Sequence, residues 1–211
     1  MTLTAQPWAL TPADVREAGR HDLDDAQLET AISVIAMFNY FTRVADASGI
    51  EFDYETPLPA FQPDLGQVTT PRPSRSAAPG QQAGSRPRPE QPRLLAAWET
   101  WRAYELETEG PIGPRERRLL AAVAAEEATD WAGVEALGGT ESRAEGDEPL
   151  IGFARKLSRQ PWRMVPGDLE SLRAAGHSEV AVLHVISVVA HQNADSRLAI
   201  GLSAVSEARG R

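Results

Sequence analysis

The sequence predicts an all-α protein, and three observations support that prediction. Apolar residues recur with helical spacing in most segments, few runs alternate with the period of two that marks a half-buried strand, and β-branched residues fall mainly inside the helical patterns. Of the 211 residues, 42% are hydrophobic and 24% are charged. This is the balance of an ordinary globular chain, so we expect a core of ordinary size.

The composition excludes several classes of function. The chain has no cysteine, which excludes disulfides, thiolate zinc sites, iron–sulfur clusters and cysteine nucleophiles. A formal net charge of −9 argues against a nucleic-acid groove, which needs clustered Lys and Arg. No apolar stretch approaches the roughly 20 residues of a membrane span, and the N-terminus lacks the pattern of a signal peptide. We therefore expect a cytoplasmic protein with neither a nucleic-acid nor a membrane partner.

The composition divides the chain into three parts. Residues 1–55 have a helical pattern, and residues 93–211 are helix-rich. Residues 56–92 hold nine of the sixteen prolines, and we expect them to form a disordered or extended linker, because proline removes amide donors and glycine adds chain entropy. Four arginines within it and one directly after it make this the one basic stretch: Arg72, Arg75, Arg86, Arg88 and Arg93. We expect these arginines to be solvated, with docking to an acidic partner as the alternative.

Five helices are expected in the C-terminal part. Pro114 suits the first turn of the second of them, which is rich in alanine, and Gly176 ends the fourth. Ser178, with Glu179 in the first turn, begins the last and longest one. The expected helices cover residues 94–106, 114–137, 150–158, 166–175 and 178–201.

The most informative feature is an internal repeat at a constant offset of 154 residues. Residues 11–50 align with residues 165–204 without a gap. Seven of the nine identities lie in one stretch, where ISVIAMFNYFTRVA in the first copy matches ISVVAHQNADSRLA in the second. Each copy is predicted to form a short helix, a turn and a long helix that carries Asn-x-x-x-Arg.

The order of these features resembles a known superfamily. The C-terminal part resembles the alkylhydroperoxidase AhpD-like, or carboxymuconolactone decarboxylase-like, superfamily, especially its peroxidase-related branch. The resemblance lies in five features in order: Pro114-Arg-Glu-Arg, the Ala-rich helix, a polar turn, FARKLSRQPWRMVPGDLESLRAAGHSE and ISVVAHQNADSRLA. The stretch AISVIAMFNYFTRVADASGIEF is even more similar to the last long helix of that branch. The resemblance implies an AhpD-like helical fold over residues 93–204, a homo-oligomer, and a duplicated terminal helix pair over residues 11–52.

The resemblance does not carry over the redox chemistry of the superfamily. Its redox site is Cys-x-x-Cys-x-x-x-His at the end of the Ala-rich helix, and Thr129-Asp130-Trp131-Ala132 stand on the cysteine motif here. The motif histidine would fall at Ala136, and the relay glutamate corresponds to Glu116. Without a thiol and a relay histidine, disulfide-based peroxide reduction is impossible. We expect no cofactor and no bound metal.

The last long helix presents a polar face that the first copy lacks. His184, His191 and Asp195 lie at i, i+7 and i+11 and point the same way. Asp195 is placed to orient His191 as an acid–base pair, whereas the two histidines lie about 10 Å apart along the helix, too far for one metal ion. The alternative is a solvent-exposed or interface face. The first copy has other residues at these positions: Thr30, Met37 and Phe41.

Acidic residues cluster where the superfamily has its active site: Glu126, Glu127, Asp130 and Glu135. In an apolar pocket, Glu127 or Asp130 could exchange protons with a substrate, and Trp131 could form the wall of a small-molecule cavity. The alternative is a solvated acidic helix end. The pair Asn193 and Arg197 suits a substrate carboxylate, but its recurrence as Asn39/Arg43 favours a helix-packing role instead.

Two functional hypotheses remain. The chain is either a cofactor-free small-molecule enzyme of the lyase or isomerase type, or a catalytically degenerate relative that acts through ligand binding or oligomeric assembly. The first needs at least two candidate groups in one apolar cavity. The second expects residues 11–50 to dock on residues 93–211 or on a neighbouring chain. The candidate catalytic residues are Glu116, Glu127, Asp130, His191 and Asp195, and the candidate substrate-binding residues are Trp131, Asn193 and Arg197.

Overall fold

The computed structural model describes residues 2–20, 23–50, 71–75, 86–141 and 143–210. Within these ranges the prediction of an all-α fold is confirmed, since the structure contains α-helices and short 3-10 helices and no strand. In chain order the elements are α1 (Thr2–Ala5), the 3-10 helix η1 (Pro7–Ala9), α2 (Pro12–Gly19), α3 (Asp25–Ser48), α4 (Pro92–Glu107), α5 (Pro114–Ala128), α6 (Trp131–Ala136), α7 (Glu148–Arg159), the 3-10 helix η4 (Pro161–Arg163), α8 (Pro166–Ala174) and α9 (Glu179–Ala208).

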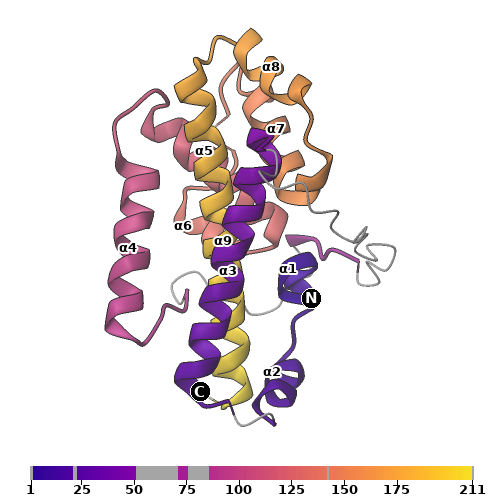
Figure 1. Cartoon of the computed structure of the whole chain (residues 1–211), viewed down its shortest axis with the longest axis vertical. Helices are drawn as coiled ribbons and strands as arrows, with labels where there is room; N and C mark the ends of the chain where they lie inside the picture. The colour runs from indigo at the N-terminus through magenta and orange to yellow at the C-terminus, as the bar shows by residue number, and fades with distance from the viewer. Residues whose placement is uncertain (1, 21–22, 51–70, 76–85, 142, 211) are drawn as a thin grey trace.

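Two long helices, α3 and α9, run antiparallel through the middle of the molecule (Figure 1). Asp24 and Gln27 form a capping box at the start of α3, and Gly49 ends the helix with a φ of 65°. An ion pair between Asp25 and Arg209 joins the start of α3 to the end of α9. The helices approach closely where Ile32 packs on the backbone of Gly201. The N-terminal part of the chain is therefore docked on the C-terminal part.

The core lies on both sides of α9. On one side, α9 packs against the alanine-rich face of α5 and against α7. On the other side, the second half of α9 forms a smaller cluster with α3 and with Trp98 of α4. As a result α9 is buried for most of its length. Among the described residues, no single helix is long and apolar enough to cross a membrane, although α8 and α9 together, bent by 118°, meet that criterion.

The Ala-rich helix is shorter than predicted. It ends at Ala128 because Thr129 adopts a left-handed conformation with a φ of 62°, which is rare for a β-branched residue. Asp130 then caps a separate helix, α6, by accepting a hydrogen bond from the amide of Gly133 at 2.8 Å. The break places Asp130 beside α9, where the hydroxyl of Ser196 donates to its carboxylate at 2.8 Å.

The two aligned segments fold into the same order of elements. The order α1–η1–α2–α3 in the first copy corresponds to α7–η4–α8–α9 in the second. The offset of 154 residues also extends further toward the N-terminus than residue 11. Four additional identities lie in the first helix, the 3-10 helix and the single residue between them in each segment: Leu3 with Leu157, Gln6 with Gln160, Pro7 with Pro161, and Trp8 with Trp162.

The two aligned segments exchange equivalent hydrogen bonds. Arg43 of the first copy donates to the carbonyl oxygen of Ser158 in the second copy at 3.1 Å. Arg197, at the equivalent position, donates to the carbonyl oxygen of Thr4 at 2.9 Å, and Thr4 is itself the counterpart of Ser158. Reciprocal contacts of this kind are typical of a two-fold interface between identical subunits. Here they join two halves of one chain.

Candidate functional site

The region that the sequence marks as a site lies where α5 ends, α6 begins and α9 passes. Asp130 and Asp195 are both buried there, and one guanidinium, that of Arg86, binds both carboxylates. Arg86 donates to Asp130 from Nη2 at 2.6 Å and from Nε at 3.1 Å, and it binds Asp195 through Nη1. Arg88 adds a second hydrogen bond to Asp195 at 2.6 Å. Two predicted acids are thus brought together around cations of the same chain.

These ion pairs keep Asp195 charged. Burial by itself raises the pKa of Asp195, but Arg86 and Arg88 outweigh burial and hold that pKa well below its usual range. Burial also lowers the pKa of Arg86, and the carboxylates of Asp195 and Asp130 reverse this effect and raise the pKa above its ordinary value. Asp195 therefore holds no proton to donate near neutral pH, and its carboxylate oxygens already accept hydrogen bonds.

His191 lies one turn before Asp195 and is fully buried. Its ring packs against Trp101, with ring centroids 4.7 Å apart, and neither ring nitrogen has a hydrogen-bond partner among the described residues. Burial lowers the pKa of His191 to about 4. Asp195 opposes this shift, whereas Arg86 and its neighbouring arginines add to it. The imidazole is therefore neutral at pH 7.

The neutral imidazole predicts a pH-dependent stability. A histidine has a pKa of about 6.5 in an unfolded chain, whereas the pKa of folded His191 is about 4. Between these values the unfolded state binds more protons, so stability falls as the pH falls. The expected loss from this group is about 2 kcal/mol between pH 7 and pH 5. Urea unfolding at both pH values should show the loss in the wild type and a loss smaller by that amount in His191→Met, which carries the residue of the first copy. An equal pH dependence in both proteins would contradict the assignment.

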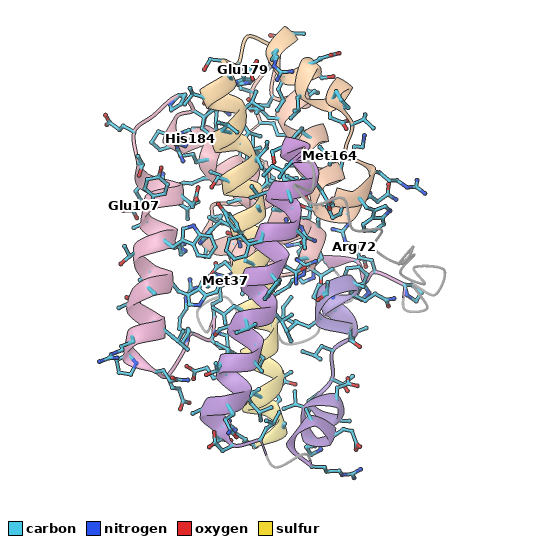
Figure 2. All side chains as sticks on the ribbon, in the orientation of Figure 1. Met37, Arg72, Glu107, Met164, Glu179 and His184 are labelled. Carbon is cyan, nitrogen blue, oxygen red and sulfur yellow. The ribbon has the colours of Figure 1, made fainter. Side chains whose placement is uncertain are left out.

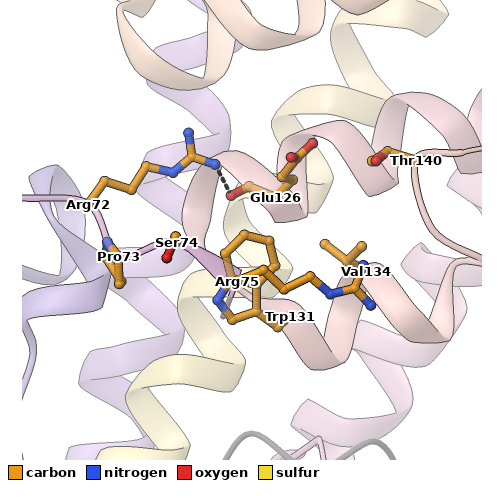
Figure 3. Close-up of a pocket in the computed structure, with 8 residues that line it drawn as sticks. All are labelled: Arg72, Pro73, Ser74, Arg75, Glu126, Trp131, Val134 and Thr140. Atoms are coloured by element: carbon orange, nitrogen blue, oxygen red, sulfur yellow. Dashed lines mark hydrogen bonds between the residues drawn. The ribbon is translucent and has the colours of Figure 1, made fainter. Parts of the chain in front are cut away.

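Glu127 is held by a separate group of arginines. Arg72 donates to its carboxylate at 2.8 Å, Arg159 donates at 2.9 Å, and Arg155 lies 3.6 Å away. Arg72 also binds the backbone carbonyl of Glu126 (Figure 3). Three guanidinium groups lie around this one buried carboxylate. Glu127 is therefore not an unpaired proton acceptor.

A pocket of about 410 Å³ opens beside Trp131. Figure 3 shows Arg75 next to the Trp131 ring, with Glu126 above them. The described residues that line the pocket are Arg72, Pro73, Ser74, Arg75, Glu126, Trp131, Val134 and Thr140. Of the predicted site residues, this set includes Trp131 alone. The enzyme hypothesis required at least two candidate groups in such a cavity, and these lining residues do not supply them.

Three other predicted residues take part in packing and capping. Glu116 accepts a hydrogen bond from the N-cap amide of α5 at 2.8 Å, and it lies about 16 Å along the helix from Glu127. Arg197 is buried, and it donates to Asn193 Oδ1 at 3.0 Å and to the Thr4 carbonyl. Burial, with a contribution from Arg43, lowers the pKa of Arg197 well below its ordinary value. The contacts of Asn193 and Arg197 match the packing alternative.

The cations of the site are not among the residues that the sequence predicts for it. Arg86 and Arg88 were expected to be solvated, and the structure corrects this, because both pair with buried acids. A signal was available: an acid on a core-facing helix position needs a cation, and residues 72–93 are the one basic stretch of the chain. The rest of the predicted linker, residues 56–70 and 76–85, lies outside the described residues. His184 is likewise paired, through Nδ1, with the buried guanidinium of Arg117 at 2.9 Å.

The fold and the site together define an all-α protein with a buried network of acids and arginines. Within the described ranges, no cluster of three or more His, Asp or Glu side chains could hold a metal ion. A comparison with models of known protein families and with curated proteins finds no match to this sequence.

Proposed function

We propose that this chain is a catalytically degenerate AhpD-like protein that acts through oligomeric assembly and not through acid–base chemistry. The observation that carries the proposal is the guanidinium of Arg86, which binds Asp130 and Asp195 together. A general base needs an available lone pair and a pKa near the working pH. Asp195 does not meet the second requirement, because the two arginines that bind its oxygens hold its pKa well below the usual range.

The AhpD-like part of the proposal is supported by the sequence motifs along residues 114–204 and by the helical order in which they occur. The assembly part is supported by the reciprocal bonds of Arg43 and Arg197, which reproduce within one chain the way that identical subunits pair.

Arg86→Ala tests the proposal. The variant removes the ion pair of the buried Asp130 and leaves Asp195 paired with Arg88, so we expect a loss of about 2–3 kcal/mol in the free energy of unfolding. Arg75→Ala is the matched control, because Arg75 comes from the same Pro- and Arg-rich stretch and is exposed. Urea unfolding measures both variants. Wild-type stability in Arg86→Ala would show that the pair is not structural and would contradict the proposal.

One observation favours a second candidate function, the cofactor-free enzyme. The neutral, fully buried His191 beside Asp195 has unpartnered nitrogens among the described residues, as a general base would. This function requires Arg86 and Arg88 to leave the site so that a substrate can enter. In the double variant Arg86→Ala/Arg88→Ala, an enzyme would exchange carbon-bound protons of small organic acids with deuterated water. In a catalytically degenerate protein, the double variant would lose stability and would not exchange these protons.

A further inference from the structure

One side of α3 is apolar, and within the described structure it is exposed to solvent. Phe38 is 63% exposed and Phe41 is 54% exposed, and three aliphatic residues between 38% and 48% exposed extend the surface. Residues 30–42 contain no charged residue. Met37 lies about halfway along the helix (Figure 2). We call this surface the α3 face, and it consists of Val34, Ile35, Met37, Phe38 and Phe41.

At the offset of 154 residues, the α3 face corresponds to a face of α9 that is buried in the core. Each of its residues has a counterpart on α9 at the offset of 154, and every counterpart is no more than 1% exposed. The counterparts are Val188, Val189, His191, Gln192 and Asp195. In the second copy they are covered by α5 and by the segment that carries Arg86. The first copy presents the same helix face uncovered within the described structure.

We infer that the α3 face binds the α3 face of a second copy of this chain, with the two helices antiparallel about a two-fold axis. The face is self-complementary in this arrangement. An axis midway between Met37 and Phe38 sets Phe41 against Val34 of the second copy, and Phe38 against Met37 of the second copy. Each aromatic ring then meets a smaller or more flexible side chain, and the antiparallel helix dipoles attract.

The size and charge of the face fit a dimer. From the exposed fractions, the five side chains offer about 300–400 Å² of apolar surface per copy. Two copies, with the usual polar rim, would bury about 1,000 Å² in total, the size at which specific interfaces begin. Each copy carries a formal charge of −9, but none of it lies within residues 30–42. Added salt therefore screens the repulsion between the copies and strengthens the dimer.

The oligomeric state tests the inference. In sedimentation velocity the wild type should form a dimer at micromolar concentrations, with a larger dimer fraction at higher salt. Phe38→Glu should be monomeric, with unchanged circular dichroism and a melting temperature lower only by the stabilisation that dimerisation adds to the wild type. Leu183→Glu is the matched control, because Leu183 is an equally exposed apolar residue on α9, and it should remain dimeric. A monomeric wild type, or a Phe38→Glu variant as dimeric as the wild type, would overturn the inference.

Single cysteines test the register, because the chain has none of its own. Met37→Cys lies beside the proposed axis and should form a disulfide-linked dimer on mild oxidation. Phe41→Cys alone should not, because its two copies lie about 10 Å apart along the helices, beyond the reach of a disulfide. A mixture of the Phe41→Cys and Val34→Cys variants should form a disulfide-linked dimer, because the proposed register sets these two positions against each other. The reverse pattern would overturn the antiparallel arrangement.

This inference rests on the assembly part of the proposed function, and the two can fail separately. The dimer is measured on variants of α3, whereas the structural role of the site is measured on Arg86→Ala. A monomeric wild type overturns the dimer surface and the assembly part of the proposed function together, whereas a dimeric wild type with an equally dimeric Phe38→Glu variant overturns the dimer surface alone.

Discussion

Removal of residues 1–90 is expected to unfold the remaining chain. The truncation uncovers the side of α9 that packs against Ile32 and Ala36, and it deprives Arg197 of the Thr4 carbonyl. It also removes both cations of Asp195. Each large apolar side chain returned to water costs about 1.5–3 kcal/mol, and a whole domain is stable by only about 5–15 kcal/mol. The combined losses exceed what the fragment can sustain.

Circular dichroism and urea unfolding of the fragment 91–211 measure this effect. We expect non-cooperative unfolding and a tendency to aggregate. Co-expression of residues 1–50 with residues 71–211 is the control, because it restores α3 and the site arginines without a covalent link. It should recover a soluble, cooperatively folding complex. A fragment 91–211 that folds cooperatively by itself, with the oligomeric state of the full chain, would show that the N-terminal copy is dispensable.

Asp195→Asn is expected to lower the free energy of unfolding by about 3–5 kcal/mol, because breaking a buried ion pair leaves an uncompensated charge. The asparagine has nearly the same shape, so the loss is electrostatic. Arg86 and Arg88 would then face a neutral amide on the buried side of α9. Chemical denaturation at pH 7 measures the effect.

Glu179→Gln is the matched control for this substitution. Glu179 is also an arginine-paired acid on α9, but both it and its partner Arg173 are exposed. Solvent screens such a pair, so stability should change little. An enzyme would give a different result for Asp195→Asn, because neutralising a catalytic group commonly leaves stability unchanged or raises it. Equal stability in Asp195→Asn and the wild type would therefore support catalysis.

The helices could be predicted wherever local signals bound them. Ser178 and Glu179 marked the start of α9, and the structure begins that helix at Glu179. The break at Thr129 could not be predicted, because local propensity disfavours a left-handed β-branched residue. The hydrogen bonds of Asp130 to Gly133 and Ser196, together with Arg86, accompany that conformation. Two of these partners lie far away in the sequence.

The acidic residues of the site could be predicted from the sequence, but their pairing with arginines could not. Asp130 and Asp195 were both candidates, but they are 65 residues apart, and only the packing of α5 on α9, with the break after α5, brings them to one guanidinium. Arg86 lies in a stretch without apolar periodicity, so no helix pattern indicated where it would lie. The extension of the repeat to Leu3 was predictable from the sequence alone, because its four identities lie at the same offset of 154 residues.

A double-mutant cycle between Arg86 and Asp195 tests the central claim most directly, which is that the acids of the site are structural partners of the chain's own arginines. Urea unfolding of Arg86→Met, Asp195→Asn and the double variant yields the coupling energy of the pair. The account predicts a coupling of at least about 1.5 kcal/mol, with the double variant more stable than the sum of the single effects implies. Additive effects would contradict it, because they would show that Arg86 does not bind Asp195 in solution.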